Sequence, residues 1–189
     1  AQASCHPAGI ATYPLKNKIQ MIEAARQAKD IGAERFDIVT SGNTLSKEEL
    51  GIIADAIWEI TSKVGIKMCA SLGRMDERGF SLLKAAGLSR YHHNIETSPG
   101  YFPKIVTTHT FQERIDTIRL AKKVGLEVCS GGIIGMGESL KDRVEMALIL
   151  KGLDVESVPL NILVPIKNTP LERYPLLSCQ EAIRTIALF

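Results

Sequence analysis

The sequence lacks the long hydrophobic runs of a membrane protein. Its longest uninterrupted apolar runs, such as Ala147–Leu150, are a few residues long, whereas a helix that crosses a bilayer needs about 20. It also lacks an excess of either charge, because 23 Lys and Arg residues against 21 Asp and Glu residues give a net charge of +2. So small and scattered a charge does not indicate nucleic acid or an anionic membrane surface as a partner.

Cysteine is scarce and unclustered. The four cysteines lie far apart, at positions 5, 69, 129 and 179, and no Cys-x-x-Cys pair is present. A zinc site is therefore not indicated. Because the sequence also has no signal peptide, we expect reduced thiols or metal ligands in a cytoplasmic protein rather than a disulfide frame.

The composition is that of an ordinary globular chain. Of its 189 residues, 45% are hydrophobic and 23% are charged, which is far from the composition of a disordered chain. The length fits a single domain, 1–189, or a piece of a larger one. Because the sequence begins without Met and ends inside an expected helix, we expect a fragment that is cut at both ends.

Helical segments alternate with short apolar runs along the whole chain. Glycines follow the ends of five helical segments, where a left-handed residue is favoured. Three pairs have the capping-box spacing that marks a helix start: Ser46 with Glu49, Thr110 with Glu113, and Ser178 with Glu181. The expected helices cover residues 15–31, 46–65, 76–87, 110–125, 139–152 and 178 onward, and the expected strands cover 34–40, 66–71, 89–95, 126–132 and 156–163.

Five strands that alternate with helices predict an α/β fold with a parallel sheet. Polar residues lie near the C-terminal ends of several strands, which is where a barrel places its active site. We therefore expect a partial (α/β)8 barrel of the TIM type, with about five β-α units. A doubly wound sheet is the alternative, but the glycines of 131–137 come late and have the wrong spacing for a dinucleotide loop. These glycines suit either close approach to a planar ligand or tight packing in a turn.

Cys69 and Cys129 occupy equivalent places near the ends of two expected strands. Two thiolates at neighbouring strand ends suit a soft metal or an iron–sulfur cluster. The alternative is that each cysteine is a small buried hydrophobic residue, which is a common role for this residue type.

Four polar residues are candidates for ligand binding. Asn94 and Glu96 are two residues apart in an expected strand, so their side chains should face the same way, either toward sugar hydroxyls or urea-type N–H groups or toward solvent. Arg114, in the first turn of the next helix, is placed to clamp a carboxylate or to form a surface ion pair. Asn161 lies in an otherwise apolar strand, and a buried amide there needs a partner such as a ligand.

Several long motifs, in this order, resemble the biotin synthase family of radical S-adenosylmethionine enzymes. They are YHHNIETS at 91–98, TTHTFQER at 107–114, VCSGGIIGMGE at 128–138, VPLN at 158–161 and TPL at 169–171. The resemblance runs from residue 1 to residue 189. It implies an (α/β)8 barrel, a homodimer, and a sulfurtransferase that inserts sulfur into dethiobiotin to form biotin.

The resemblance also implies two iron–sulfur clusters. The family's Cys-x-x-x-Cys-x-x-Cys loop, which binds a 4Fe–4S cluster, ends just before a stretch that here reads Ala1–Ser4, so we expect that loop to lie outside this chain. Cys69 and Cys129 match two of the three cysteines that hold an auxiliary 2Fe–2S cluster, the implied sulfur donor. Asp37 stands in place of the third cysteine, which leaves open a 2Fe–2S cluster or a variant cluster with other ligands.

Further roles follow from the same resemblance. Asn94 and Glu96 match the pair that bridges the S-adenosylmethionine ribose and the ureido ring of dethiobiotin. Arg114 matches an arginine near the methionine carboxylate, and Asn161 matches a substrate contact. An electron donor such as flavodoxin or ferredoxin is implied as a partner.

Three alternatives remain open on the sequence alone. The first is another radical S-adenosylmethionine enzyme, of the hydrogenase-maturation or methylornithine-synthase type. The second is a barrel without redox chemistry that binds a phosphorylated ligand. The third is that the fragment is inert by itself.

Overall fold

The computed structural model describes residue 11 and residues 13–189 of the chain. Ala1–Ser4 and Cys5 lie outside the described residues. The described chain divides into two compact units. The N-terminal unit consists of residues 13–93 and 117–128, and the C-terminal unit takes most of its residues from 94–116 and 129–189.

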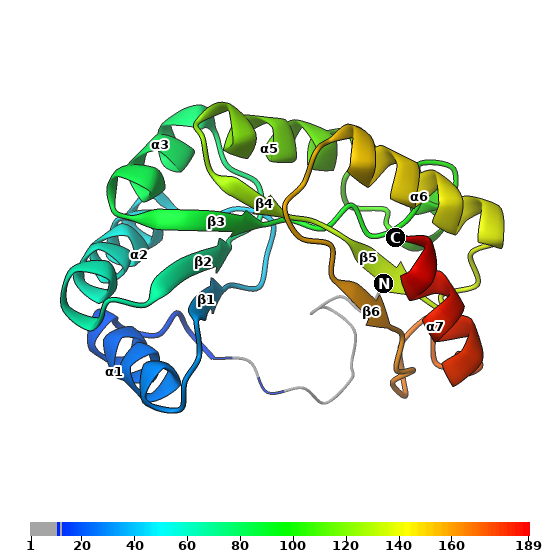
Figure 1. The fold of residues 1–189 in the computed structure, drawn as a ribbon, viewed down its shortest axis with the longest axis horizontal. Coiled ribbons are helices and arrows are strands. Elements are labelled where there is room, and N and C mark those ends of the chain that lie inside the picture. Colours follow the sequence, from blue (N-terminus) through cyan, green and yellow to red (C-terminus); the bar gives the residue numbers. More distant parts are fainter. Residues whose placement is uncertain (1–10, 12) are drawn as a thin grey trace. The chain divides into compact units, whose positions relative to one another are not determined.

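A four-stranded sheet organises the N-terminal unit. Its strands are β1 (Arg35–Val39), β2 (Lys67–Ser71), β3 (Leu88–His92) and β4 (Glu127–Cys129), in that order. The helices α1 (Lys18–Asp30), α2 (Lys47–Glu59), α3 (Glu77–Ala85) and α5 (Phe111–Lys123) lie along one side of it (Figure 1). Met68, Ala70 and Tyr91 are fully buried, because they alternate with the polar residues of the opposite side of the sheet.

The helices begin at the polar caps that the sequence predicts. At the start of α2, the Ser46 hydroxyl accepts from the Glu49 N–H, and the Glu49 carboxylate accepts from the Ser46 N–H. The helix then continues as a π-helical turn at Ile60–Val64. There the Thr61 hydroxyl donates to the Ile57 carbonyl, at 2.8 Å, and Gly65 ends the turn in the left-handed region, at φ 69°.

A second, two-stranded parallel sheet lies in the C-terminal unit. It pairs β5 (Gly132–Ile134) with β6 (Leu160–Ile162). The unit also contains α4 (Phe102–Ile105), α6 (Leu140–Gly152) and α7 (Cys179–Leu188). The pairings of β1 with β2, of β2 with β3 and of β5 with β6 are all parallel, which confirms the predicted α/β class.

The last two expected strands are interrupted or much reduced because the backbone changes partners. The strand expected at 126–132 is split into β4 and β5, since Ser130 N–H donates to Ser157 while the Gly131 carbonyl accepts from Ile95 N–H. The strand expected at 156–163 is reduced to β6. Pro159 precedes β6 and has no N–H with which to extend the ladder.

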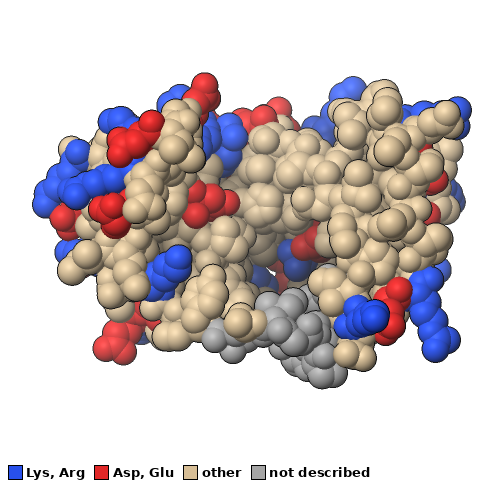
Figure 2. All heavy atoms as spheres, turned by 90° about the horizontal axis from the view of Figure 1, so that it is seen from below, with Lys and Arg blue, Asp and Glu red and all other residues tan. Residues whose placement is uncertain are grey.

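The described residues contain no helix that is long and apolar enough to cross a membrane. On the face of the molecule that Figure 2 shows, basic and acidic side chains both occur, and neither sign forms a broad continuous area. This mixture agrees with the small net charge of +2.

Candidate functional site

The backbone at Glu96 is bent into a conformation that non-glycine residues rarely adopt. β3 ends at His92, and Glu96 has φ 70°, in the left-handed region. The Glu96 N–H donates to the Gly131 carbonyl, and the Glu96 carbonyl accepts from Ile133 N–H. The expectation that Asn94 and Glu96 lie in a strand is therefore wrong, because β3 ends before both residues. Such strain clusters at functional sites.

Arg114 ties this bent segment to α5. Its Nη1 donates to the Asn94 carbonyl at 2.7 Å and lies 3.4 Å from Glu96 Oε1. Its Nε donates to His109 Nε2 at 2.9 Å. The guanidinium also lies over the Phe102 ring, with Cζ 5.8 Å from the ring centroid. Arg114 is thus part of a built site and not a surface ion pair.

The Glu96 carboxylate is only half satisfied by protein. Its Oε2 is buried and has no hydrogen-bond partner among the described residues. Burial raises the pKa of Glu96, and the positive charge of Arg114 opposes that shift. A buried acceptor without a partner is costly, so this oxygen fits a ligand that brings a hydroxyl or N–H donor.

Asn94 uses its side-chain oxygen to hold the neighbouring loop. Its Oδ1 accepts from Gly131 N–H at 3.0 Å. The side-chain amide group therefore remains as a pair of donors. The Asn94 amide can donate hydrogen bonds and the Glu96 carboxylate can accept them, so the site offers a ligand both donors and an acceptor.

The glycines at 131 and 132 serve packing. A Cβ on Gly131 would collide with the Pro159 backbone, and one on Gly132 would collide with the Glu96 backbone. Of the two sequence interpretations, tight packing is the one that the structure supports. These glycines act on the site indirectly, because they let the bent segment at Glu96 approach β5.

Cys69 and Asp37 are direct neighbours on β2 and β1. They are paired in the strand register, on the polar side of the sheet. Burial, followed by the negative charge of Asp37, raises the pKa of the Cys69 thiol, while Arg35 and Arg90 oppose that shift. The pKa of Asp37 is raised to about 6 by the protein atoms packed around its carboxyl group, although the residue is still exposed at the surface. A metal at this place would have to displace the proton of the thiol.

The predicted cluster ligand Cys129 and the predicted substrate contact Asn161 lie in the C-terminal unit. Cys129 is half-buried and bridges to Ser157. Asn161 is exposed on β6, so the expectation of a buried amide is wrong. Within residue 11 and residues 13–189, no group of three His, Cys, Asp or Glu side chains is arranged to hold a metal ion. Cys69 and Asp37 supply only two adjacent donors, and a cluster there needs further ligands.

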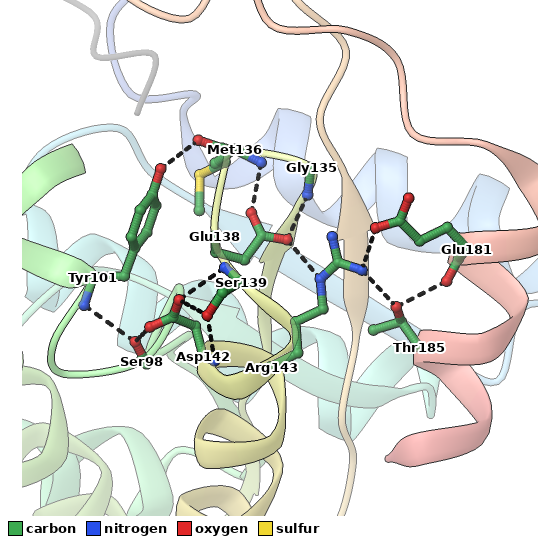
Figure 3. A network of polar contacts seen from close by, with 10 residues as sticks. All are labelled: Ser98, Tyr101, Gly135, Met136, Glu138, Ser139, Asp142, Arg143, Glu181 and Thr185. Carbon is green, nitrogen blue, oxygen red and sulfur yellow. Dashed lines mark hydrogen bonds and ion pairs between the residues drawn. The ribbon is translucent and has the colours of Figure 1, made fainter.

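A polar network that the sequence did not predict holds the loop after β5 (Figure 3). Glu138 accepts from Gly135 N–H at 2.8 Å and from Met136 N–H at 2.7 Å. Its carboxylate also forms a 2.8 Å ion pair with Arg143. Arg143 in turn reaches Glu181 on α7, at 2.8 Å. In the sequence, Glu138 is visible only as an acidic residue directly before the Ser139 cap. That position does not identify the groups with which its carboxylate interacts.

The model of the radical SAM superfamily matches residues 5–150 of the chain. A biotin synthase of Thermotoga neapolitana is 51% identical over 189 residues, which cover 68% of that protein. The chain belongs to the biotin synthase family of the radical SAM superfamily. Biotin synthases of Thermotoga petrophila and Pelotomaculum thermopropionicum are 50% and 48% identical, and the chain covers 63% and 59% of their lengths. The chain thus spans roughly two-thirds or less of these curated relatives.

Solved structures share the fold at lower identity. Methylornithine synthase superposes with a TM-score of 0.82 at 21% identity, over 95% of this chain and 54% of that one. The FeFe-hydrogenase maturase of Carboxydothermus hydrogenoformans gives a TM-score of 0.79 at 19% identity, over 95% of this chain and 44% of that one. At these identities the likeness concerns the fold alone, and it agrees with the expected partial barrel.

Proposed function

We propose that the protein to which this chain belongs is a biotin synthase, which inserts sulfur between two carbons of dethiobiotin. The observation that carries the proposal is the buried, unpartnered Oε2 of Glu96 beside Arg114. This oxygen is a hydrogen-bond acceptor without a donor, and it lies next to a cation in a member of the biotin synthase family. S-adenosylmethionine has matching groups, since its ribose carries hydroxyl donors and its methionine part carries a carboxylate.

The residues of this chain act by binding and orienting. Glu96 would accept a hydrogen bond from the ribose or from the ureido ring of dethiobiotin, and Asn94 would donate its amide. Arg114 would face the methionine carboxylate. When bound, a 4Fe–4S cluster supplies the electron that cleaves S-adenosylmethionine into methionine and a 5′-deoxyadenosyl radical. Binding cofactor and substrate through one pair of side chains would make radical formation depend on substrate, and close placement of reactants lowers the barrier.

The sulfur donor belongs to the same proposal. We infer that Cys69 and Cys129 ligate an auxiliary iron–sulfur cluster, of the 2Fe–2S type or a variant. Asp37 is a harder ligand than thiolate, and its register position beside Cys69 makes it the candidate third ligand. Asn161, which is exposed on β6, would contact substrate.

The remaining parts of the proposal concern the whole protein. Residues 1–189 would form one partial barrel domain of a cytoplasmic homodimer. A small electron-transfer protein such as flavodoxin or ferredoxin would reduce it.

The test is anaerobic turnover of the full-length, iron- and sulfide-reconstituted protein with dethiobiotin, S-adenosylmethionine and a reductant. We expect biotin in the wild type, and loss of biotin together with auxiliary-cluster absorbance in Cys129→Ala. Cys179→Ala is the matched control, because Cys179 is an exposed cysteine at the start of α7. Biotin formation by Cys129→Ala at the wild-type rate would contradict the ligand role.

A second candidate is another radical SAM activity without an auxiliary cluster. It is favoured by Asp37 at the third ligand position and by the lack of a three-donor metal group in the described part of the chain. Iron and sulfide content separates the two. Iron for one cluster, with cleavage of S-adenosylmethionine that dethiobiotin does not stimulate, would support the second candidate.

A further inference from the structure

The guanidinium of Arg114 is fixed on two of its three nitrogens. Nε donates to His109 Nε2 at 2.9 Å, and Nη1 donates to the Asn94 carbonyl at 2.7 Å. Nη2 takes part in neither of these two hydrogen bonds. Because the His109 imidazole occupies Nε, a carboxylate cannot bind Nε and Nη2 of Arg114 together.

His109 is itself held in place. An arginine Nε–H is always a donor, so Nε2 of His109 must be the acceptor and the imidazole proton must lie on Nδ1. Nδ1 lies 2.9 Å from Thr108 Oγ1, which is then an acceptor for that proton. The imidazole also packs edge-on against Phe102, at 5.6 Å between ring centroids, and Phe102 lies under Arg114.

We propose that His109 is a positioning residue, which holds Arg114 so that Nη2 points at the methionine carboxylate of S-adenosylmethionine. The inference rests on the proposed function, and it adds a residue to which the family resemblance gave no role. A planar guanidinium binds carboxylates directionally. Without an acceptor at Nε, rotation of the Arg114 side chain would turn Nη2 away from the carboxylate.

The test compares two ligands on full-length, reconstituted protein. One is S-adenosylmethionine, and the other is its decarboxylated analogue, which lacks the carboxylate but keeps the sulfonium and the ribose. The quantity measured is the ratio of their dissociation constants in each variant, as in a double-mutant cycle. A general loss of structure would weaken both ligands and leave the ratio unchanged.

Three variants make the test specific. Arg114→Gln removes the carboxylate contact and should reduce the preference for S-adenosylmethionine by roughly 10- to 150-fold. His109→Phe keeps a ring against Phe102 but removes the acceptor, and should reduce the preference by about tenfold. His109→Gln places an amide oxygen near the position of Nε2, and should restore most of the preference. Thermal unfolding of each variant is followed in parallel.

The outcomes are distinguishable. If Arg114→Gln lowers the ratio while His109→Phe leaves it at the wild-type value, the positioning role is wrong. If both His109 variants lower it equally, the acceptor is not what matters, and the proposal fails. If Arg114→Gln leaves the ratio unchanged, Arg114 does not bind the carboxylate and the inference falls with that assignment. If the wild type binds neither ligand, the proposed function itself is wrong.

Discussion

Two glutamate–arginine pairs of the C-terminal unit have different surroundings. In the pair of Glu138 with Arg143, both carboxylate oxygens accept backbone N–H groups, and the ion-pair distance is 2.8 Å. In the pair of Glu96 with Arg114, the distance is 3.4 Å and Glu96 Oε2 has no partner among the described residues. The side chains of the first pair are 2% and 6% exposed, and those of the second 17% and 15%.

The pKa values of the two arginines differ in a way that matches the difference between their glutamates. Burial acts to lower the pKa of Arg143, but the hydrogen bonds to Glu138 and Glu181 outweigh it and the pKa is raised. Burial lowers the pKa of Arg114, and Glu96 only partly opposes that shift. Removal of one partner from a complete buried pair is strongly destabilising because it leaves a buried charge uncompensated. An incompletely paired carboxylate with a shifted pKa is typical of a site that a ligand completes.

The largest expected effect comes from breaking the complete pair. Arg143→Met should lower the free energy of unfolding by about 3–5 kcal/mol, because it leaves the Glu138 carboxylate buried without its cation. The measurement is chemical denaturation of the full-length protein. A loss below about 1 kcal/mol would show that the network does not hold the loop after β5.

A second prediction compares the same substitution, Glu to Gln, at the two glutamates. Glu138→Gln removes an acceptor that backbone N–H groups use, and should cost about 2–3 kcal/mol of stability. Glu96→Gln removes a charge that is poorly paired, and should change stability by less than about 1 kcal/mol. Equal losses in the two variants would remove the distinction between a structural pair and a binding pair.

A third prediction concerns pH. Burial raises the pKa of Glu96 above its ordinary value of 4.5, so the folded state holds this proton more tightly than the unfolded state. The stability contributed by this group therefore falls as pH rises from 4.5 through the raised pKa. Glu96→Gln should lack that decline, so the difference in stability between variant and wild type should grow in favour of the variant over this range. A difference that is constant with pH contradicts the shift.

The smallest effect is expected at an exposed pair in the N-terminal unit. Lys123 and Glu77 form a 2.6 Å ion pair with side chains 63% and 50% exposed. Lys123→Met should change stability by roughly 0–1 kcal/mol, and it serves as the matched control for Arg143→Met. A cost comparable to that of Arg143→Met would show that burial is not what separates the pairs.

Local signals predicted much of the fold. The capping boxes at Ser46 and Ser178 and the glycine at 65 mark helix ends that the structure shows within a few residues. α4 was not predicted, because four residues that include Pro103 carry no helical periodicity. The split between β4 and β5 depends on partners that are distant in the sequence.

The candidate site was predicted only in part. Asn94, Glu96 and Arg114 were identified, and the structure brings them together through the Asn94 carbonyl and the Glu96 carboxylate. The left-handed backbone at Glu96 was not foreseen, since no local rule places a glutamate there. His109 was missed as a positioning residue, because its contact with the Arg114 Nε crosses from a loop to a helix. The exposure of Asn161 could not be read from its apolar neighbours.

The ligand-binding role of Glu96 is tested most directly by binding of S-adenosylmethionine to full-length, reconstituted Glu96→Gln, with and without dethiobiotin. A hydrogen bond to a charged group is worth about 1.5–3 kcal/mol, so we expect binding that is about 10- to 150-fold weaker, with stability at neutral pH changed by less than about 1 kcal/mol. We also expect that dethiobiotin no longer strengthens the binding of S-adenosylmethionine. Binding, coupling between the two ligands and turnover that all equal those of the wild type would show that Glu96 does not bind them.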